Sequence, residues 1–255
     1  MATGLLEMSD PQGSKYRATI EYDGTEYYGF QVQKDKPTVQ GAIEDALGCT
    51  AGASVRLAGA GRTDTGVHAV GQVISFRLAW AHSVSDLQRA LNARLPADVV
   101  IRELAKAEDA FHPRFSARSR VYRYTVLNQD IRSPLERRRA YQIAGMLSCS
   151  RMDSGAQTLV GSHDFATFGN PTTGRSSVRE VMSATWIRTG DWLHFDIEAN
   201  GFLRRMVRTI VSALLAVGHG EWDQDAISSL LAAEDRAQAP PPAPACGLCL
   251  MQVRY

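Results

Sequence analysis

Residues 57–71 read LAGAGRTDTGVHAVG, a glycine-rich turn between two apolar stretches that have the composition of β-strands. The ionisable residues of this segment are Arg62, Asp64 and His68. Its turn glycines are Gly59, Gly61 and Gly66. Glycine allows a positive φ or a close approach of two backbones, so a polar tip around Asp64 can be held against a ligand. An ordinary hairpin with a solvated aspartate would use the same residues, and their spacing does not decide between the two.

The sequence on both sides of this turn predicts strands and helices in a regular order. Polar and apolar residues alternate in the predicted strands, whereas apolar residues recur every three to four positions in the predicted helices. Thr38 is a suitable N-cap for the first helix, and Pro96 ends the second. The elements predicted for this half are a strand at 17–22, a helix at 39–47, strands from 55 and at 72–78, a helix at 85–95 and a strand at 99–104.

The rest of the chain repeats this order of strands and helices. The predicted elements are a strand at 118–127, a helix at 151–160, strands at 181–188 and 192–197, a helix at 202–217 and a strand at 249–255. A further helix is predicted at 225–233, followed by an extended, proline-rich segment at 237–244. Strand, helix, strand, strand, helix, strand is the order of ferredoxin-like and RNA-recognition folds.

The sequence therefore predicts an α+β protein with two similar ferredoxin/RRM-like half-domains, residues 15–111 and 112–255. No Gly/Ser-rich linker separates them, so we expect one continuous, mainly antiparallel sheet flanked by helices, with the active-site cleft between the halves. Residues 1–14 are small, polar and interrupted by Pro11 and Gly13, which predicts a disordered leader.

Composition indicates a cytoplasmic protein. The chain has 255 residues, 44% of them hydrophobic, but contains no apolar run of about 18 residues and no signal peptide. Its four cysteines are too few and too scattered for a disulfide framework. Cys246 and Cys249 form a CxxC pair, but a zinc site would need a second pair, and the sequence has none.

Basic residues are concentrated in one segment, although the net charge is only +1. Eight of the 24 arginines lie at 114–139, against two acidic residues. Because the planar guanidinium fits phosphate, this segment predicts contacts with an RNA backbone, among them from Arg118, Arg120 and Arg123. Arg204 and Arg205 fit either a solvated helix face or phosphate contacts.

Several motifs resemble the tRNA pseudouridine synthase A family. The most specific is Gly61-Arg62-Thr63-Asp64-Thr65-Gly66-Val67-His68-Ala69, and the others extend the resemblance over nearly the whole chain. They are residues 21–24 (EYDG), 28–31 (YGFQ), 111–117 (FHPRFSA), 122–124 (YRY), 163–165 (HDF) and 206–208 (MVR).

This resemblance implies an isomerase that converts uridine to pseudouridine in the tRNA anticodon stem and loop, at positions 38–40. It also implies a homodimer, and an enzyme that needs neither a cofactor nor a metal. Asp64 matches the family's catalytic aspartate, the expected nucleophile, with Arg62 and Arg208 as the candidate cations that keep it charged. Tyr122 matches the active-site tyrosine, and Leu248 matches an apolar residue that lines the pocket.

The chemistry leaves alternatives open. A carboxylate can attack the sugar or the base covalently, or remove a proton from the sugar, and the sequence does not distinguish these routes. A non-catalytic RNA-binding protein with a duplicated RRM-like sheet is a second reading, but an acid near phosphates would weaken its binding. A glycosidase would need two facing acids, and no second acid is identifiable near Asp64. A lone histidine such as His68 is more often structural than a ligand.

Overall fold

The computed structural model describes residues 13–170 and 176–255. Most of the leader predicted at residues 1–14 lies outside these ranges, but strand β1 already begins at Ser14. The strands are β1 (Ser14–Tyr22), β2 (Leu57–Gly59), β3 (His68–Leu78), β4 (Val99–Lys106), β5 (Ser119–Asn128), β6 (Tyr141–Ile143), β7 (Gly161–Asp164), β8 (Val178–Thr189), β9 (Trp192–Ala199) and β10 (Leu248–Arg254). The helices are α1 (Val39–Ala51), α2 (Val84–Asn92), α3 (Cys149–Gln157), α4 (Met206–His219) and α5 (Ala226–Ala233).

All these strands belong to one sheet with the order β4-β1-β3-β10-β5-β9-β8-β7, while β2 pairs with β3 and β6 with β5. The pairs are antiparallel except for β3 with β10 and β5 with β6. The first half contributes β4-β1-β3-β2 and the second β10-β5-β9-β8, which is the same order of equivalent strands. The predicted α+β fold with two similar halves and a continuous sheet is therefore confirmed.

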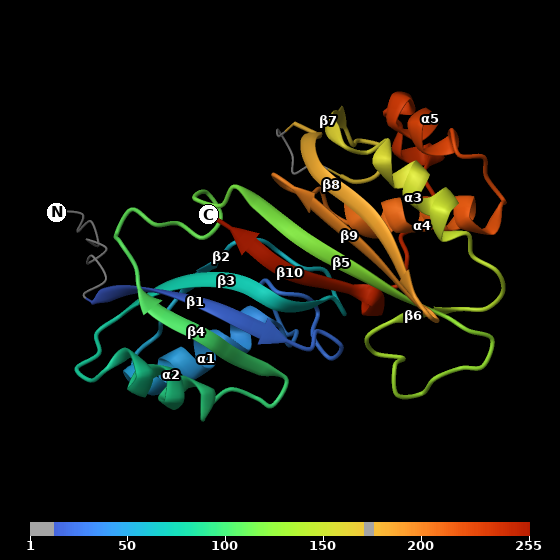
Figure 1. Ribbon diagram of the computed structural model, residues 1–255. Helices are drawn as coiled ribbons and strands as arrows, with labels where there is room; N and C mark the ends of the chain where they lie inside the picture. The colour runs from blue at the N-terminus through green and yellow to red at the C-terminus, as the bar shows by residue number, and fades with distance from the viewer. Residues whose placement is uncertain (1–12, 171–175) are drawn as a thin grey trace.

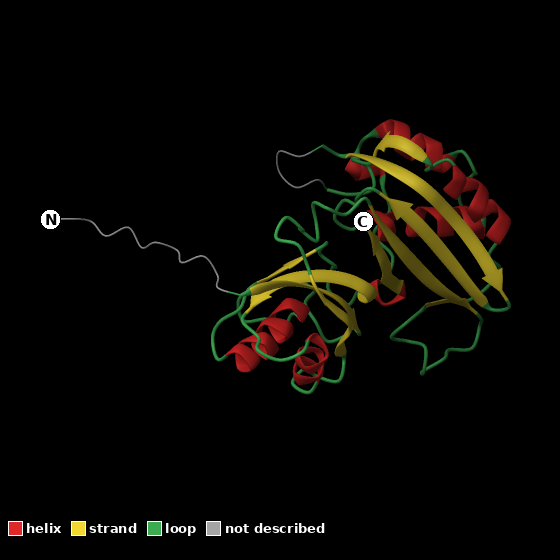
Figure 2. Cartoon of the chain, turned by 60° about the vertical axis from the view of Figure 1, so that its left-hand side comes forward, coloured by secondary structure: helices red, strands yellow, loops and turns green. Residues whose placement is uncertain are grey.

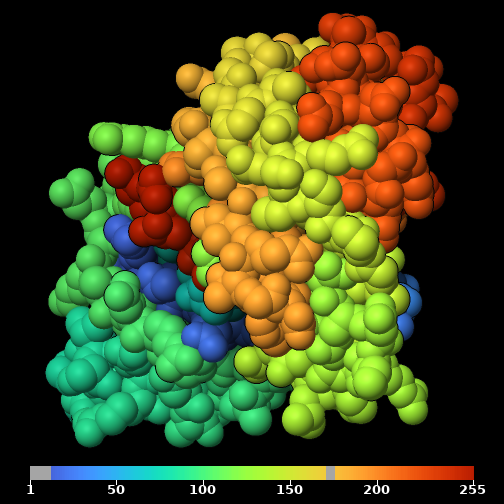
Figure 3. Space-filling model, turned by 45° about the vertical axis from the view of Figure 1, so that its right-hand side comes forward, coloured from blue at the N-terminus to red at the C-terminus, as the bar shows by residue number. Residues whose placement is uncertain are grey.

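The two halves meet at strand β10. In sequence β10 belongs to the second half, yet it lies between β3 of the first half and β5 (Figure 1). In the space-filling view its dark red residues lie between the blue N-terminal strand and the orange residues of β8 and β9 (Figure 3). Helices α1 and α2 cover one half of the sheet and α3, α4 and α5 the other (Figure 2).

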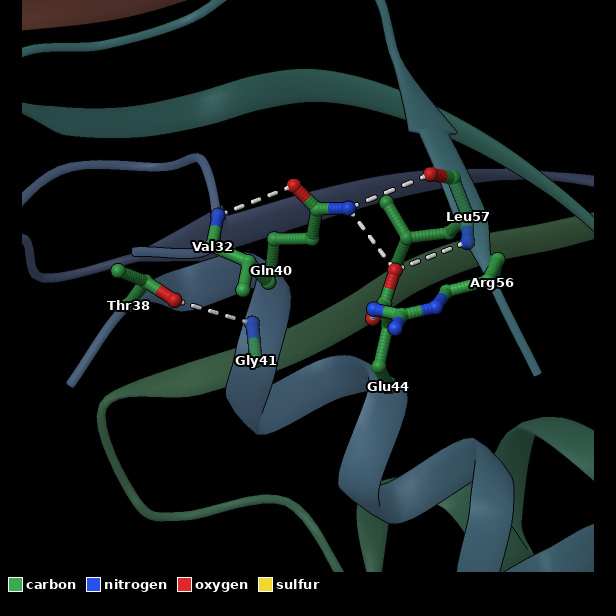
Figure 4. Close-up of polar contacts among 7 residues, drawn as sticks. All are labelled: Val32, Thr38, Gln40, Gly41, Glu44, Arg56 and Leu57. Atoms are coloured by element: carbon green, nitrogen blue, oxygen red, sulfur yellow. Dashed lines mark hydrogen bonds and ion pairs between the residues drawn. The ribbon is translucent and has the colours of Figure 1, made fainter. Parts of the chain in front are cut away.

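Helix α1 positions the strand that leads into the glycine-rich turn. The Thr38 side chain caps the helix by accepting a hydrogen bond from the backbone N–H of Gly41. One turn further along the helix, Glu44 accepts the N–H of Leu57 at 3.1 Å. Gln40, the residue before Gly41, donates from its Nε2 to the Leu57 carbonyl (Figure 4). Both backbone groups of the first β2 residue are thus bound by side chains of α1.

Each half has its own helix-facing layer of buried side chains. In β1, alternate residues such as Tyr16 and Ile20 are at most 1% exposed and face the helices, as the alternation predicts. In the second half, Phe195 of β9 is fully buried together with most of α4. Helix α4 is apolar nearly all round, which is typical of a helix enclosed on several sides.

The structure corrects several predicted boundaries. The helix predicted at 202–217 begins at Met206, because Arg205 has a left-handed backbone with φ 65° and Arg204 forms a β-bridge with Asn170. Strand β3 begins four residues before the predicted 72, at His68. Strands β6 and β7 were not predicted; each has only three or four residues, too few to show a period.

Candidate active site

The glycine-rich turn is tied to its surroundings mainly through its backbone. Gln72 Nε2 donates to the Gly61 carbonyl at 2.9 Å, and the N–H of Phe30 donates to the Thr63 carbonyl at 3.1 Å. The N–H of Val67 donates to the Asp64 carbonyl at 3.1 Å and closes the turn. These bonds fix the backbone on both sides of Asp64 while leaving its carboxylate available.

The three turn glycines have different roles. Gly66 has a φ of 76°, so it needs the left-handed conformation that glycine adopts at no steric cost. A Cβ on Gly59 would lie 2.5 Å from the Phe30 ring, so this position requires a close approach. Gly61 shows neither feature: its φ is not positive, and nothing lies within 4 Å of the position that a Cβ would take.

A buried tyrosine supports the residue before Asp64. The Tyr22 hydroxyl and Thr63 Oγ1 are hydrogen-bonded at 2.8 Å, and both residues are buried. Burial is the main cause that raises the pKa of Tyr22, so its hydroxyl stays protonated. Tyr22 thereby fixes the Thr63 side chain beneath the turn.

Asp64 of the first half lies beside Arg208 of the second. Arg208 Nη1 is 3.8 Å from Asp64 Oδ2, and the two side chains are 15% and 29% exposed. Arg208 is on the first turn of α4, and its Nε donates to the carbonyl of Ala243 at 2.6 Å. Burial lowers the pKa of Arg208 and the charge of Asp64 opposes this shift. The pair therefore places a carboxylate and a cation together at the junction of the two halves.

Of the two predicted cations, the structure brings only Arg208 to Asp64. The side chain of Arg62 is exposed and makes no hydrogen bond or ion pair within residues 13–170 and 176–255. Its role stays a prediction, and its exposure leaves it free to meet a ligand.

Tyr122 of β5 lies close enough to Asp64 for the charge of the carboxylate to act on its hydroxyl. It is 9% exposed, and its ring packs edge-on against Phe202 with a centroid distance of 5.1 Å. Burial raises the pKa of Tyr122, and the charge of Asp64 raises it further. Leu248 is buried next to Tyr124, opposite it in the pairing of β10 with β5. The positions of Tyr122 and Leu248 are compatible with the predicted roles, which stay predictions.

The three arginines predicted to bind phosphate differ in their surroundings. Arg118 has an exposed side chain. The guanidinium of Arg120 is half-buried and donates to four backbone carbonyls, those of Ala60, Arg114, Ala117 and Asn200. Arg123 forms a two-point ion pair with Asp196, with both distances at 2.7 Å. Only Arg118 therefore has a guanidinium unengaged by other described residues.

His68 and the two C-terminal cysteines have structural surroundings. His68 is buried, the N–H of Gly24 lies 3.0 Å from its Nδ1, and Asp23 Oδ1 lies 3.2 Å from the same nitrogen. Cys246 and Cys249 are both free thiols. Burial raises the pKa of Cys249 to about 11, which makes it a poor nucleophile at neutral pH.

Two hollows elsewhere on the sheet do not include the site. They have volumes of 420 and 360 Å³ and share Arg17, Thr19 and Glu103. Arg17 and Thr19 alternate with the helix-facing residues of β1, so these hollows lie on the opposite face of the sheet from the buried core. Neither contains Asp64 or Arg208.

Sequence reasoning missed the groups that hold Asp64 and Arg208 in place. Tyr22 could have been assigned to the buried face of β1 from its alternation, but its bond to Thr63 depends on how β1 and the turn pack. The carbonyl of Ala243 carries no sequence signal, because every residue has a carbonyl group.

A carboxylate that one half holds beside a largely buried arginine of the other fits a catalytic site better than a passive polyanion-binding site, because an unneeded acid repels phosphate. The comparisons with known proteins agree with this class. The family model described as tRNA pseudouridine synthase matches residues 18–116 and 156–255, and the chain belongs to this family, whose members isomerise uridine in tRNA.

Three curated relatives, each named tRNA pseudouridine synthase A, match over nearly their whole length. The protein of Geobacter sp. (strain M21) is 42% identical over 92% of this chain and 96% of its own. That of Caulobacter vibrioides (strain NA1000 / CB15N) is 42% identical, with 94% and 98% covered. That of Thermoanaerobacter sp. (strain X514) is 39% identical, with 92% and 97% covered.

Proposed function

We propose that this protein converts uridine to pseudouridine in the anticodon stem and loop of tRNA, at positions 38–40, with Asp64 as the nucleophile. The observation that carries the proposal is the apposition of Asp64 and Arg208 at the junction of the two halves. The family to which the chain belongs supports the reaction, and the name shared by its relatives supports tRNA as the substrate.

In the proposed reaction Asp64 attacks C1′ of the ribose as the bond from C1′ to N1 of uracil breaks. The uracil turns within the site, C5 forms a bond to C1′, and the carboxylate leaves. The C5 proton is lost and N1 gains one, so the reaction needs no oxidant and no energy source. Attack on the base and removal of a sugar proton are the alternative first steps.

Arg208 is assigned the role of keeping Asp64 charged. A carboxylate that loses water when substrate closes the site would otherwise favour its neutral form, which is not nucleophilic. Arg62, exposed on the same turn, is proposed to contact the substrate backbone. Tyr122 is proposed to support the extruded uracil, and Leu248 to line the pocket beside it.

The direct test is to incubate the purified protein with unmodified tRNA transcripts and to map pseudouridine by chemical labelling and primer extension. New signals confined to positions 38–40 are expected. Binding without any modification would favour the non-catalytic RNA-binding alternative, which the family membership does not support. Modification confined to other positions would refute the proposed substrate region.

The salt dependence of tRNA binding should locate the phosphate contacts. Arg118→Gln should lower the slope of log Kd against log salt by about 0.7 to 0.9, the contribution of one phosphate contact. Arg123→Gln should change the slope less, because Asp196 already holds that guanidinium at 2.7 Å. Binding would be measured between low and moderate salt by filter retention. Unchanged slopes for both variants and for Arg120→Gln would mean that this segment is not the tRNA surface.

We also propose that the protein acts as a homodimer whose tRNA contacts both subunits, as the family resemblance implies, and that it lies in the cytoplasm, as its composition indicates. No helix among the described residues has both the length and the apolar character needed to cross a bilayer. Light scattering on the purified protein tests the dimer, and a mass of one chain at micromolar concentration would refute it.

A further inference from the structure

A short segment before β10 connects the two residues of the proposed catalytic pair. We call residues 243–247 the strap. It comprises Ala243, Pro244 and a single 3₁₀ turn at Ala245–Gly247, and it leads directly into Leu248. Prolines at 240, 241 and 242 precede it and restrict the backbone on that side.

The strap holds Arg208 at two points. Arg208 Nε donates to the Ala243 carbonyl at 2.6 Å, and the N–H of Ala243 donates to the Arg208 carbonyl at 3.0 Å. Because the guanidinium is planar, fixing Nε fixes the direction of both terminal nitrogens. Nη1 is the nitrogen that lies 3.8 Å from Asp64. The position of the Ala243 carbonyl therefore sets the geometry of the pair.

Tyr124 in turn holds the strap. Its hydroxyl donates to the carbonyl of Pro244, the residue after Ala243, at 2.8 Å. The ring is fully buried, and a Cβ on Gly247 would lie 2.7 Å from two of its carbons, so the strap backbone lies directly against it. Burial raises the pKa of Tyr124 far enough that the hydroxyl remains a donor at all working pH values.

The strap also touches the turn that carries Asp64. The Cβ of Ala245 lies 3.2 Å from the position that a Cβ on Gly66 would take. The same five residues thus contact the arginine, the tyrosine and the turn, and a shift of the strap would change the separation of Asp64 and Arg208.

From these contacts we infer that Tyr124 is a positioning residue for the reaction: its hydroxyl fixes the strap, and the strap directs Arg208 toward Asp64. The inference rests on the proposed function, in which Asp64 and Arg208 carry out the chemistry. Tyr124 itself touches no reacting atom. Its neighbour in the YRY motif, Tyr122, is the residue proposed to contact the substrate, so the two tyrosines have separate roles.

The first test is Tyr124→Phe, which removes only the hydroxyl. The single-turnover rate should fall about tenfold, the effect of leaving one buried carbonyl without its donor, while the Kd for tRNA stays within about twofold. Tyr16→Phe is the matched control, because Tyr16 is an equally buried strand tyrosine far from the strap, stacked on Phe76. The control should keep the wild-type rate. An unchanged rate for Tyr124→Phe would overturn the inference.

A double-mutant cycle separates positioning from a general loss of packing. In an Arg208→Lys background the residue that Tyr124 acts through is already altered, so Tyr124→Phe should cause no further loss of rate. If the two substitutions acted independently, their separate losses of rate would multiply instead. A multiplied loss would show that Tyr124 acts without Arg208 and would overturn the inference.

A measurement on the free protein, without tRNA, tests the role of Tyr124 separately from the proposed function of Asp64 and Arg208. The Arg208 Nε–H, assigned by its absence in Arg208→Lys, should be protected from solvent exchange in NMR spectra of the free protein. Tyr124→Phe should speed its exchange by about tenfold or more, in line with the loss of one buried hydrogen bond. Unchanged exchange would overturn the inference even if Asp64 and Arg208 are catalytic. If Asp64→Asn stayed active, the proposed function would fail while this coupling could still be measured.

Discussion

Asp64→Asn should abolish pseudouridine formation while leaving the fold and the affinity for tRNA nearly intact. The substitution keeps the size of the side chain but replaces a nucleophilic carboxylate by a neutral amide, so we expect the single-turnover rate to fall by at least about a thousandfold. The carboxylate is 29% exposed and 3.8 Å from its partner. Arg208 keeps its bond to the Ala243 carbonyl without the carboxylate, so the free energy of unfolding should fall by no more than about 2 kcal/mol.

Asp196→Asn provides a matched control. Asp196 is 30% exposed and also pairs with an arginine, Arg123, but on the other face of β5 from Tyr122. At saturating enzyme this variant should modify tRNA at the wild-type rate. If Asp64→Asn kept its rate within tenfold of wild type, the assignment of Asp64 as nucleophile would be wrong.

Replacing Tyr122 should separate the stacking of its ring from any contribution of its hydroxyl. A uridine in a stem or loop must be extruded before its glycosidic bond can be reached, which costs a few kcal/mol of stacking and pairing. Stacking on an aromatic ring returns about 1 to 3 kcal/mol per base. We therefore expect Tyr122→Phe to keep tRNA binding and to lose rate only as far as the hydroxyl assists proton transfer. Removal of the ring should lower both binding and rate by about tenfold to a hundredfold.

The stability of the Tyr122 variants must be measured beside their activity, because the ring also packs on Phe202. Tyr122→Ala leaves a cavity that costs about 3 to 5 kcal/mol, whereas Tyr122→Leu fills most of the volume without an aromatic face. A tRNA with 2-aminopurine beside the target uridine reports unstacking by fluorescence. Normal turnover and a normal fluorescence change in Tyr122→Leu would assign the tyrosine to the core and leave another residue to support the uracil.

The sequence predicted the fold well because its signals are local. Alternation in β1 and capping by Thr38 at α1 both lie within a few residues of the element that they define. The start of α4 was wrong for the opposite reason. Phe202 and Leu203 continue the apolar spacing of the helix, but the bridge from Arg204 to Asn170 is a tertiary contact that no local pattern contains.

The candidate site shows the same limit. The motif around Asp64 could be found by its residues, and Arg208 by resemblance, but nothing in their separation of 144 positions indicates which cation approaches the carboxylate. Arg62, two residues away in the same turn, was an equal candidate, yet its side chain points into solvent. Similarly, the carbonyls that engage Arg120 depend on where β5 packs against the glycine-rich segment.

The central place of β10 has a consequence for biosynthesis. Cys249 and Leu250 of β10 pair with His68 and Ala69 of β3, which leave the ribosome about 180 residues earlier. Until β10 emerges, the nascent chain carries two incomplete sheets whose facing edges are unpaired, the kind of edge at which strands of different chains associate. The strap precedes β10 directly, so its hydrogen bonds to Arg208 become possible at the same stage as the joining of the halves. Strand β10 thus links its own synthesis to the joining of the two halves, and we expect a chain that lacks residues 248–254 to be without the proposed activity.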